Sequence, residues 1–122
     1  MLEKRLEIYA RDNYKCQYEG CDVTGCDNLE LAHRISKGKN NVNWVRNVIR
    51  RKFDVDLSDV KIMDILNHPL NLKTSCRKHN DYFNIGNKPE KAKLLLIDIY
   101  YTIYAKNLRE VNKNGSEDDL QD

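Results

Sequence analysis

Two pairs of residues with metal-ligand spacing lie far apart in this chain. Cys16 and Cys21 form a C-x4-C pair in CQYEGC, and Cys76 and His79 form a C-x2-H pair in CRKHN. A structural zinc site needs four soft or borderline ligands in a tetrahedron, and two close pairs from distant segments commonly supply them. We therefore predict that these two pairs bind one Zn²⁺ ion.

A further cysteine, Cys26, leaves an alternative open. It could replace Cys21 as a ligand, or it could stay a free thiol beside the site. Gly20, between Cys16 and Cys21, suits a tight knuckle and favours Cys21 as the ligand. In a reducing compartment, four cysteines indicate metal binding before disulfides.

Length and composition suit one small domain. The chain has 122 residues, of which 40% are hydrophobic, enough for one modest core that often needs a metal as a staple. We expect a single domain over residues 1–111 and a disordered acidic tail over 112–122. The charged N-terminus lacks the apolar stretch of a secretory signal, and no apolar run reaches membrane length, so we expect a cytoplasmic protein.

The charge distribution is uneven. The formal net charge is +2, but the tail from Lys113 onward carries four acidic residues against one base. The preceding residues hold 20 basic and 15 acidic side chains. This excess suits a polyanionic partner such as nucleic acid, although many domains with such an excess bind none.

Hydrophobic periodicity and turn residues predict the elements that position these side chains. We expect helices over residues 2–13, 42–53, 58–66, 77–85 and 89–111, strands over 28–36 and 70–74, and a turn over 37–41. The first helix is expected to carry Leu2, Leu6 and Tyr9 or Ile8 on one face. Ser58 is the predicted cap of the helix that follows it. The last helix is apolar on more than one face, which is typical of a central core helix or a dimer contact.

In this order, the segments resemble the HNH endonucleases, the ββα-metal nuclease family. RDNYKCQYEGC resembles the opening segment, LELAHRI the first motif strand, HPLNLKTSC the second strand and CRKHNDYFN the closing helix. The resemblance covers about residues 5–88. It implies an α+β fold with a small zinc-stapled ββα-metal core over about 14–88, flanking helices, and a helical insertion over about 40–66 between the motif strands.

The resemblance also implies an activity, which is metal-dependent hydrolysis of DNA phosphodiester bonds. His33 matches the general base, and Asn71 matches the asparagine that orients it. Asn80 and Asn84 match the positions that bind the catalytic Mg²⁺ or Mn²⁺ ion. A neutral imidazole suits a base near physiological pH, and on a helix the i, i+4 spacing would aim both amides at one point.

One position departs from the family pattern and keeps a second interpretation open. Family members place Asp, Glu or His directly before the base, and here that position is Ala32. A shifted alignment would make His33 a metal ligand and put Arg34 in place of the base. The alternative function is therefore a catalytically degenerate, zinc-stabilised module that binds DNA or another protein.

Basic residues after the first motif strand are candidates for contact with DNA, because Arg and Lys contacts to phosphates dominate affinity for nucleic acids. They are Arg34, Lys37, Lys39, Arg46, Arg50 and Arg51, and Lys52 shares the helix of the last three. The same pattern is equally typical of a solvated helix face. A homodimer or a larger assembly could form through the last helix.

Overall fold

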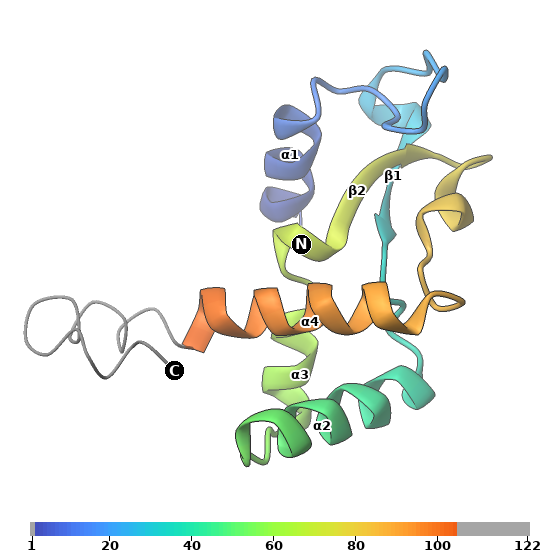
Figure 1. Ribbon diagram of the computed structural model, residues 1–122. Coiled ribbons are helices and arrows are strands. Elements are labelled where there is room, and N and C mark those ends of the chain that lie inside the picture. Colours follow the sequence, from blue (N-terminus) through green and yellow to red (C-terminus); the bar gives the residue numbers. More distant parts are fainter. Residues whose placement is uncertain (1, 105–122) are drawn as a thin grey trace, which may run out of the picture.

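The computed structural model describes residues 2–104. This part of the chain has an α+β fold in which four α-helices surround one two-stranded sheet (Figure 1). The elements are α1 (Leu2–Arg11), β1 (Leu29–His33), α2 (Lys39–Phe53), α3 (Asp59–Leu66), β2 (Leu72–Cys76) and α4 (Pro89–Tyr104). The α+β class predicted from the sequence is confirmed.

The sheet consists of β1 and β2, which pair antiparallel along their whole length. Leu29 lies opposite Cys76, and His33 lies opposite Leu72. The helices α2 and α3 occupy the chain between the two strands. As a result, the end of β1 that carries His33 faces the helices, whereas the end of β2 that carries Cys76 lies far from them (Figure 1).

Helix α1 packs on the sheet with its C-terminal half. Ile8 and Tyr9 are buried, and the Tyr9 hydroxyl donates a hydrogen bond to the backbone oxygen of Leu29 at 2.8 Å. Leu2 and Leu6, which the sequence placed on the same face, are 69% and 42% exposed. A sheet of two short strands covers only the end of the helix that is tied to it.

The tie between α1 and β2 is the carboxylate of Asp12. It accepts a hydrogen bond from the Thr74 backbone N–H at 3.0 Å and pairs with Arg11 at 2.9 Å. Burial raises the pKa of Asp12, but the hydrogen bonds from Arg11 and Thr74 outweigh burial and hold this pKa below its ordinary value. The ionised carboxylate therefore fixes the end of α1 to the second strand.

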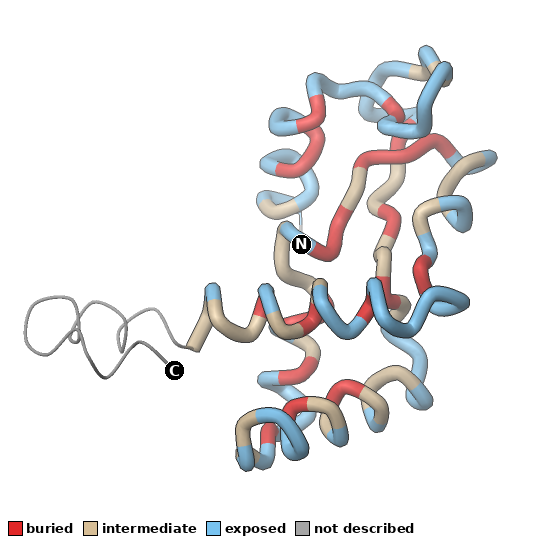
Figure 2. The backbone as a smooth tube through the Cα atoms, in the orientation of Figure 1, coloured by how far each residue is buried: buried red, intermediate tan, exposed pale blue. Residues whose placement is uncertain are grey.

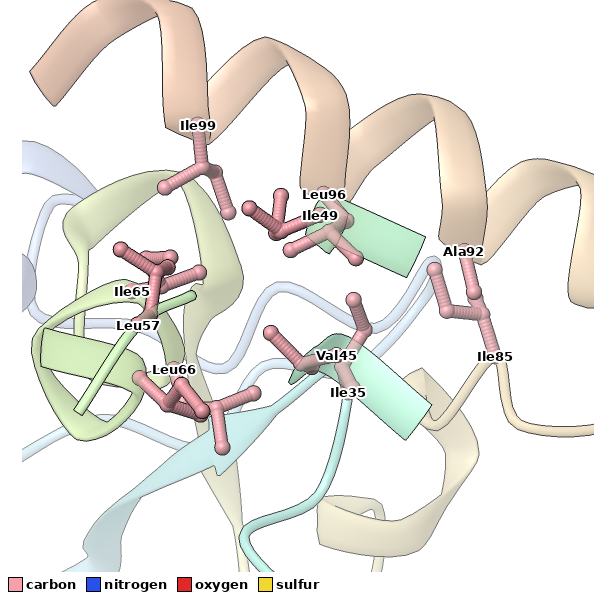
Figure 3. Packing of buried hydrophobic residues seen from close by; sticks show 11 residues of the cluster. Ile35, Val45, Ile49, Leu57, Ile65, Leu66, Ile85, Ala92, Leu96 and Ile99 are labelled. Atoms are coloured by element: carbon pink, nitrogen blue, oxygen red, sulfur yellow. The ribbon is translucent and has the colours of Figure 1, made fainter. Parts of the chain in front are cut away.

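The larger apolar core lies among α2, α3 and α4 (Figure 3). Helix α4 contributes Ala92, Leu96 and Ile99, whose spacing places them on one helix face. In Figure 3, Leu96 and Ile99 point toward α2 and α3. The other buried members are Ile35, Val45, Ile49, Leu57, Ile62, Ile65, Leu66 and Ile85. This core accounts for the helical half of the fold without any metal.

The second apolar cluster is much smaller and lies at the end of the sheet where Leu29 pairs with Cys76. Its buried members are Tyr9, Cys16, Leu29 and Cys76, so two of the four are thiols. Figure 2 shows that the segment between α1 and β1 is exposed along most of its length. Apolar burial alone gives this end of the molecule little stability, because so little surface is removed from water.

The ends of α2 and α3 lie close to the positions predicted from the sequence. The Ser58 hydroxyl accepts a hydrogen bond from the Lys61 backbone N–H at 3.3 Å, so the predicted cap of α3 is confirmed. Helix α2 begins at Lys39, which makes the turn predicted over 37–41 shorter than expected. It ends at Phe53, and the next residue, Asp54, caps it with a left-handed φ of 57°, a conformation that aspartate tolerates better than most residues.

The helix predicted over residues 77–85 is wrong. Only a short 3-10 helix, η3 (Asn80–Phe83), forms there, and Asn84 is extended with φ −66° and ψ 127°. Asn, Asp, Tyr and Phe are all mediocre helix formers. The Asn84 side chain also accepts a hydrogen bond from the Gly86 backbone N–H at 2.6 Å, and such local bonds compete with a helix.

The last helix, α4, begins at Pro89 as predicted and is described as far as Tyr104. Its predicted continuation to residue 111 and the predicted disorder of residues 112–122 lie outside the described residues. Within residues 2–104, none of the helices combines the length and the apolar composition that crossing a bilayer requires.

Candidate functional site

The two ligand pairs predicted from the sequence come together in space. One ligand atom from each of Cys16, Cys21, Cys76 and His79 lies within 4.8 Å of all the others. The Sγ atoms of Cys21 and Cys76 are 4.0 Å apart, and His79 Nδ1 lies 3.3 Å from Cys76 Sγ and 3.8 Å from Cys16 Sγ. We call these four residues the Cys/His cluster.

The first half of the cluster is formed by a turn of the chain after α1. Cys16 donates its backbone N–H to Val23 at 3.0 Å, and the Cys21 N–H bonds to Tyr18 at 2.9 Å. Gly20 takes a φ of 85°, which an L side chain rarely adopts, so glycine is required there. The turn thereby directs Cys21 into the cluster, while Cys26 is exposed and lies outside it.

The spacing of the four atoms fits a tetrahedral metal ion. Metal–sulfur bonds of ~2.3 Å in a tetrahedron place the sulfur atoms ~3.8 Å apart. The 4.0 Å separation between Cys21 and Cys76 is close to this value. A site with four protein ligands leaves no open position for substrate, which is typical of a structural metal centre.

The surroundings of Cys76 favour a thiolate. Burial raises the pKa of this thiol, but hydrogen bonds from the backbone N–H groups of His79 and Lys78 oppose burial and bring the pKa below its ordinary value. The thiolate is the form that binds a metal. The short turn between Cys76 and His79 therefore positions the Cys76 thiol and, together with the Cys16 and Cys21 side chains, lowers its pKa.

Aromatic rings hold the histidine of the cluster in place. The Tyr18 ring stacks on the His79 ring with centroids 4.2 Å apart and an interplanar angle of 15°. Tyr82 meets both rings edge to face, at 4.9 Å from Tyr18 and 5.1 Å from His79. These contacts fix the orientation of the imidazole that faces the thiols.

The predicted general base, His33, stands at the last position of β1 and is partly buried. Its Nε2 lies 2.9 Å from the side-chain oxygen Oδ1 of Asn67, which follows α3. Burial lowers the pKa of His33 below its ordinary value; the hydrogen bond with Asn67 opposes this effect, and the charge of Lys37 adds to it. The imidazole is therefore neutral near physiological pH.

The predicted orienting residue, Asn71, is fully buried, and its side chain bonds to the backbone. It accepts a hydrogen bond from the Ile35 N–H at 2.9 Å and donates to the backbone oxygens of Ile35 and Leu66 at 3.0 and 2.8 Å. None of these bonds reaches His33. Asn71 joins the exit of β1 to the end of α3, and the direct partner of His33 is Asn67.

The two amides predicted to bind a divalent ion do not converge in this structure. The Asn80 amide donates to the carboxylate of Glu30 at 3.0 Å, whereas the Asn84 oxygen accepts the N–H of Gly86. Along a strand, side chains three residues apart point to opposite faces, so Glu30 and its partner Asn80 lie on the other face of β1 from His33. Ion binding by Asn80 and Asn84 stays a prediction that this arrangement does not support.

The position before His33 carries no ligand for a metal, because the Ala32 side chain is a methyl group, and this side chain is fully buried. Glu30 lies two residues earlier and therefore on the same face as Ala32. Besides Asn80, it contacts the guanidinium of Arg77 at 3.3 Å. Glu30 is thus the carboxylate of β1. The resemblance implies a metal ligand at position 32, and Glu30 lies two residues before that position.

The predicted DNA contacts fall into two groups. Arg46 and Arg50 on α2 are paired with the acidic side chains of Asp59 and Asp56. Arg34, Lys37, Lys39 and Arg51 have no ion-pair partner among the described residues. The sequence alone does not separate these groups, because the two ion pairs depend on how the chain that follows α2 folds back on this helix.

Comparison with protein-family models, curated proteins and solved structures finds no match for this chain. One end of the two-stranded sheet carries the Cys/His cluster, whose four ligand atoms are compatible with a structural metal site. The other end carries a neutral, hydrogen-bonded imidazole.

Proposed function

We propose that this protein is a zinc-stabilised endonuclease of the HNH kind that hydrolyses DNA phosphodiester bonds, with His33 as the general base. The observation that carries the proposal is the state of His33. Its ring is held by Asn67 at 2.9 Å, and burial lowers its pKa, so the imidazole is uncharged and able to accept a proton. An excess of basic residues before the acidic tail supports a polyanionic substrate.

The hydrogen bond to Asn67 assigns a role to each nitrogen of the His33 ring. Because the amide oxygen accepts the bond, Nε2 carries the ring proton and Nδ1 is the unprotonated nitrogen. In the proposed reaction, Nδ1 takes a proton from a water molecule as the water oxygen bonds to phosphorus. The bond from phosphorus to one ester oxygen breaks, and this leaving oxygen gains a proton from solvent.

Zinc is the proposed occupant of the Cys/His cluster. Three thiolates and one imidazole are a ligand set that structural Zn²⁺ commonly takes. Cys16 and Cys21 would hold the ion from the loop after α1, and Cys76 and His79 from the end of β2. The ion would stabilise this end of the fold, where the apolar cluster is small.

The proposed activity is metal-dependent, and Mg²⁺ or Mn²⁺ would supply Lewis-acid assistance to the phosphate. The predicted ligands Asn80 and Asn84 do not fit such an ion as they stand, since their amides face different partners. The step assigned to the chain itself is therefore the proton transfer at His33.

Plasmid cleavage tests the proposal. Supercoiled DNA is incubated with the natural protein, with His33→Ala and with His68→Asn, in buffers that contain Mg²⁺ or Mn²⁺. His68 is the matched control because its ring only accepts a local hydrogen bond from the Leu70 N–H, which asparagine can replace. We expect cleavage by the natural protein and by His68→Asn, and at least ~100-fold slower cleavage by His33→Ala. Equal rates for all three would refute the proposal.

A second candidate function is a zinc-stabilised binding module without catalysis. Two observations favour it: Ala32 stands where a metal ligand is expected, and the amides of Asn80 and Asn84 point to separate partners. Leu94 on α4 is 69% exposed and is a candidate contact for a second copy or a larger partner. A protein that shifts DNA on a gel but never cuts it would favour this second function.

A further inference from the structure

A hollow between α2 and α4 is lined mainly by positive charge. Its lining residues are Val48, Arg51 and Lys52 from α2 and Lys93 from α4, and its volume is about 190 Å³. Arg51 and Lys52 follow Val48 by three and four residues, so these three side chains share one helix face. We call this site the cationic hollow.

Within residues 2–104, no acidic side chain forms an ion pair with the cations of the hollow. Among the described residues, Arg51, Lys52 and Lys93 make no ion pair, whereas Arg46 and Arg50 on the same helix α2 each pair with an aspartate. Like charges held close together repel one another, and a bound anion removes this cost. Of the basic residues of α2 without an ion pair among the described residues, Arg51 and Lys52 lie at its C-terminal end and Lys39 at its N-terminal end.

Helix termini do not explain this arrangement. Arg51 and Lys52 lie in the last turn of α2, where a cation is favoured by the helix dipole. Lys93, however, is the fifth residue of α4 and lies toward the end of that helix where the dipole disfavours a cation. Two helices thus place cations around one hollow. The helix dipole accounts for Arg51 and Lys52 on α2 but not for Lys93 on α4.

The hollow also lies apart from the Cys/His cluster. In Figure 1, α2 occupies the opposite end of the molecule from the loop that precedes β1, which carries Cys16 and Cys21. A ligand in the hollow would hold the substrate on the helical half of the protein. The chemistry proposed for His33 would occur at a separate point along the same substrate.

We propose that the cationic hollow binds phosphates of the DNA backbone, with one phosphate contact for each of its three cations, and anchors the duplex on the helical half of the protein. The guanidinium of Arg51 offers a planar set of donors to phosphate oxygens, and the two ammonium groups add charge. This inference rests on the proposed function, because it requires a DNA substrate. It adds Lys93, on a different helix, to the DNA contacts and removes Arg46 and Arg50 from them.

Salt-dependent DNA binding tests the inference. A fluorescent DNA duplex is titrated with protein in zinc-containing buffer without Mg²⁺ or Mn²⁺, and anisotropy is measured at several salt concentrations. The test variant carries Arg51→Gln, Lys52→Gln and Lys93→Gln. The matched control carries Lys15→Gln, Lys61→Gln and Lys88→Gln, three exposed lysines outside the hollow, so both variants lose the same charge.

Each phosphate contact contributes ~0.9 to the slope of log K against log salt. We expect the test variant to lose ~2.7 from this slope and to bind ~100-fold more weakly at ~0.1 M salt. We expect the control variant to stay near the natural protein. If the triple variant is not folded by circular dichroism, Lys93→Gln alone replaces it, with an expected loss of ~0.9 in slope.

The outcomes separate the two proposals. Equal effects of the test and control variants would overturn the anchor and leave the nuclease proposal intact, because the effect would then come from total charge. Failure of the natural protein to bind or cut DNA would overturn both. Tighter binding to phosphatidylglycerol vesicles than to DNA, abolished by the test variant, would assign the hollow to a membrane surface and overturn the anchor.

Discussion

The side-chain oxygen of Asn67 lies 2.9 Å from Nε2 of His33, although the two residues are separated by both helices of the insertion. The hydrogen bond fixes the ring at the end of β1 and sets which nitrogen carries the proton. It therefore links the fold, through the end of α3, to the chemistry proposed for the imidazole.

The first prediction concerns pH. The pKa of His33 is lowered from 6.5, so the neutral base persists to more acidic pH than a free histidine would allow. We expect kcat/KM for DNA cleavage to fall on the acidic side with a midpoint below 6.5. The stability contributed by neutral His33 is fully present above its unfolded pKa and is lost as the pH falls through the lower folded pKa.

A substitution of the partner sharpens this test. Asn67→Asp has nearly the same shape but places a negative charge beside the ring, which favours the imidazolium. We expect the acidic midpoint of the cleavage profile to move upward by ~1 unit, with full activity retained at high pH. An unchanged midpoint would show that the titrating group is not His33.

The second prediction concerns the Cys/His cluster. Cys76→Ser removes a buried ligand, and we expect zinc content to fall from about one ion per chain to none. Because metal binding and folding are coupled in small domains, we expect a loss of at least ~3 kcal/mol of stability and a Tm lower by ~12 °C or more. Elemental analysis and thermal melts measure both quantities.

Cys26→Ser is the matched control for this prediction. It also removes one thiol, but Cys26 is exposed and lies outside the cluster. We expect this variant to keep its zinc and its Tm. If Cys26→Ser loses zinc and Cys76→Ser keeps it, the assignment of the ligands is wrong.

The sequence predicted the Cys/His cluster well because its signal is local. Each pair of ligands is only a few residues long, and a single tetrahedral ion needs both pairs. The capping role of Ser58 is also predictable from the sequence, because α3 begins at the next residue. In both cases the pattern that makes the prediction, a ligand pair or a helix cap, spans at most six consecutive residues.

The surroundings of His33 could not be predicted, because they depend on distant contacts. Asn67 reaches the ring only after α2 and α3 have folded back on the sheet, and no periodic pattern marks it. The helix expected to hold Asn80 and Asn84 failed for the opposite reason. Its residues are weak helix formers. The side chain of Asn84 bonds to the nearby backbone, which competes with the helix that the residue spacing predicted.

The third prediction separates a structural role of Asn71 from a catalytic one. Asn71→Ala would leave two backbone oxygens and one backbone N–H without their buried partners. We expect the free energy of unfolding to fall by ~3 kcal/mol in urea denaturation. A variant of full stability that had lost cleavage would instead place Asn71 in the reaction.

The fourth prediction concerns the ring that stacks on His79. Aromatic pairs of this kind contribute ~0.5–1.5 kcal/mol, so we expect Tyr18→Ala to release zinc to a chelator ~2- to 10-fold faster. Tyr18→Phe keeps the ring and should release zinc at the natural rate. If both variants release zinc at the natural rate, the stacked ring contributes nothing to metal retention. If both release it equally fast and faster than the natural protein, the hydroxyl group and not the ring retains the metal.

Chemical rescue tests the central claim, that the His33 imidazole accepts the proton in DNA hydrolysis, most directly. The rate of plasmid cleavage by His33→Ala is measured with and without added imidazole, over a pH series and beside the natural protein. We expect imidazole to restore a measurable part of the lost cleavage rate. We expect the rescued rate to rise with the concentration of neutral imidazole across the pH series. Cleavage by His33→Ala at the natural rate without imidazole would contradict it.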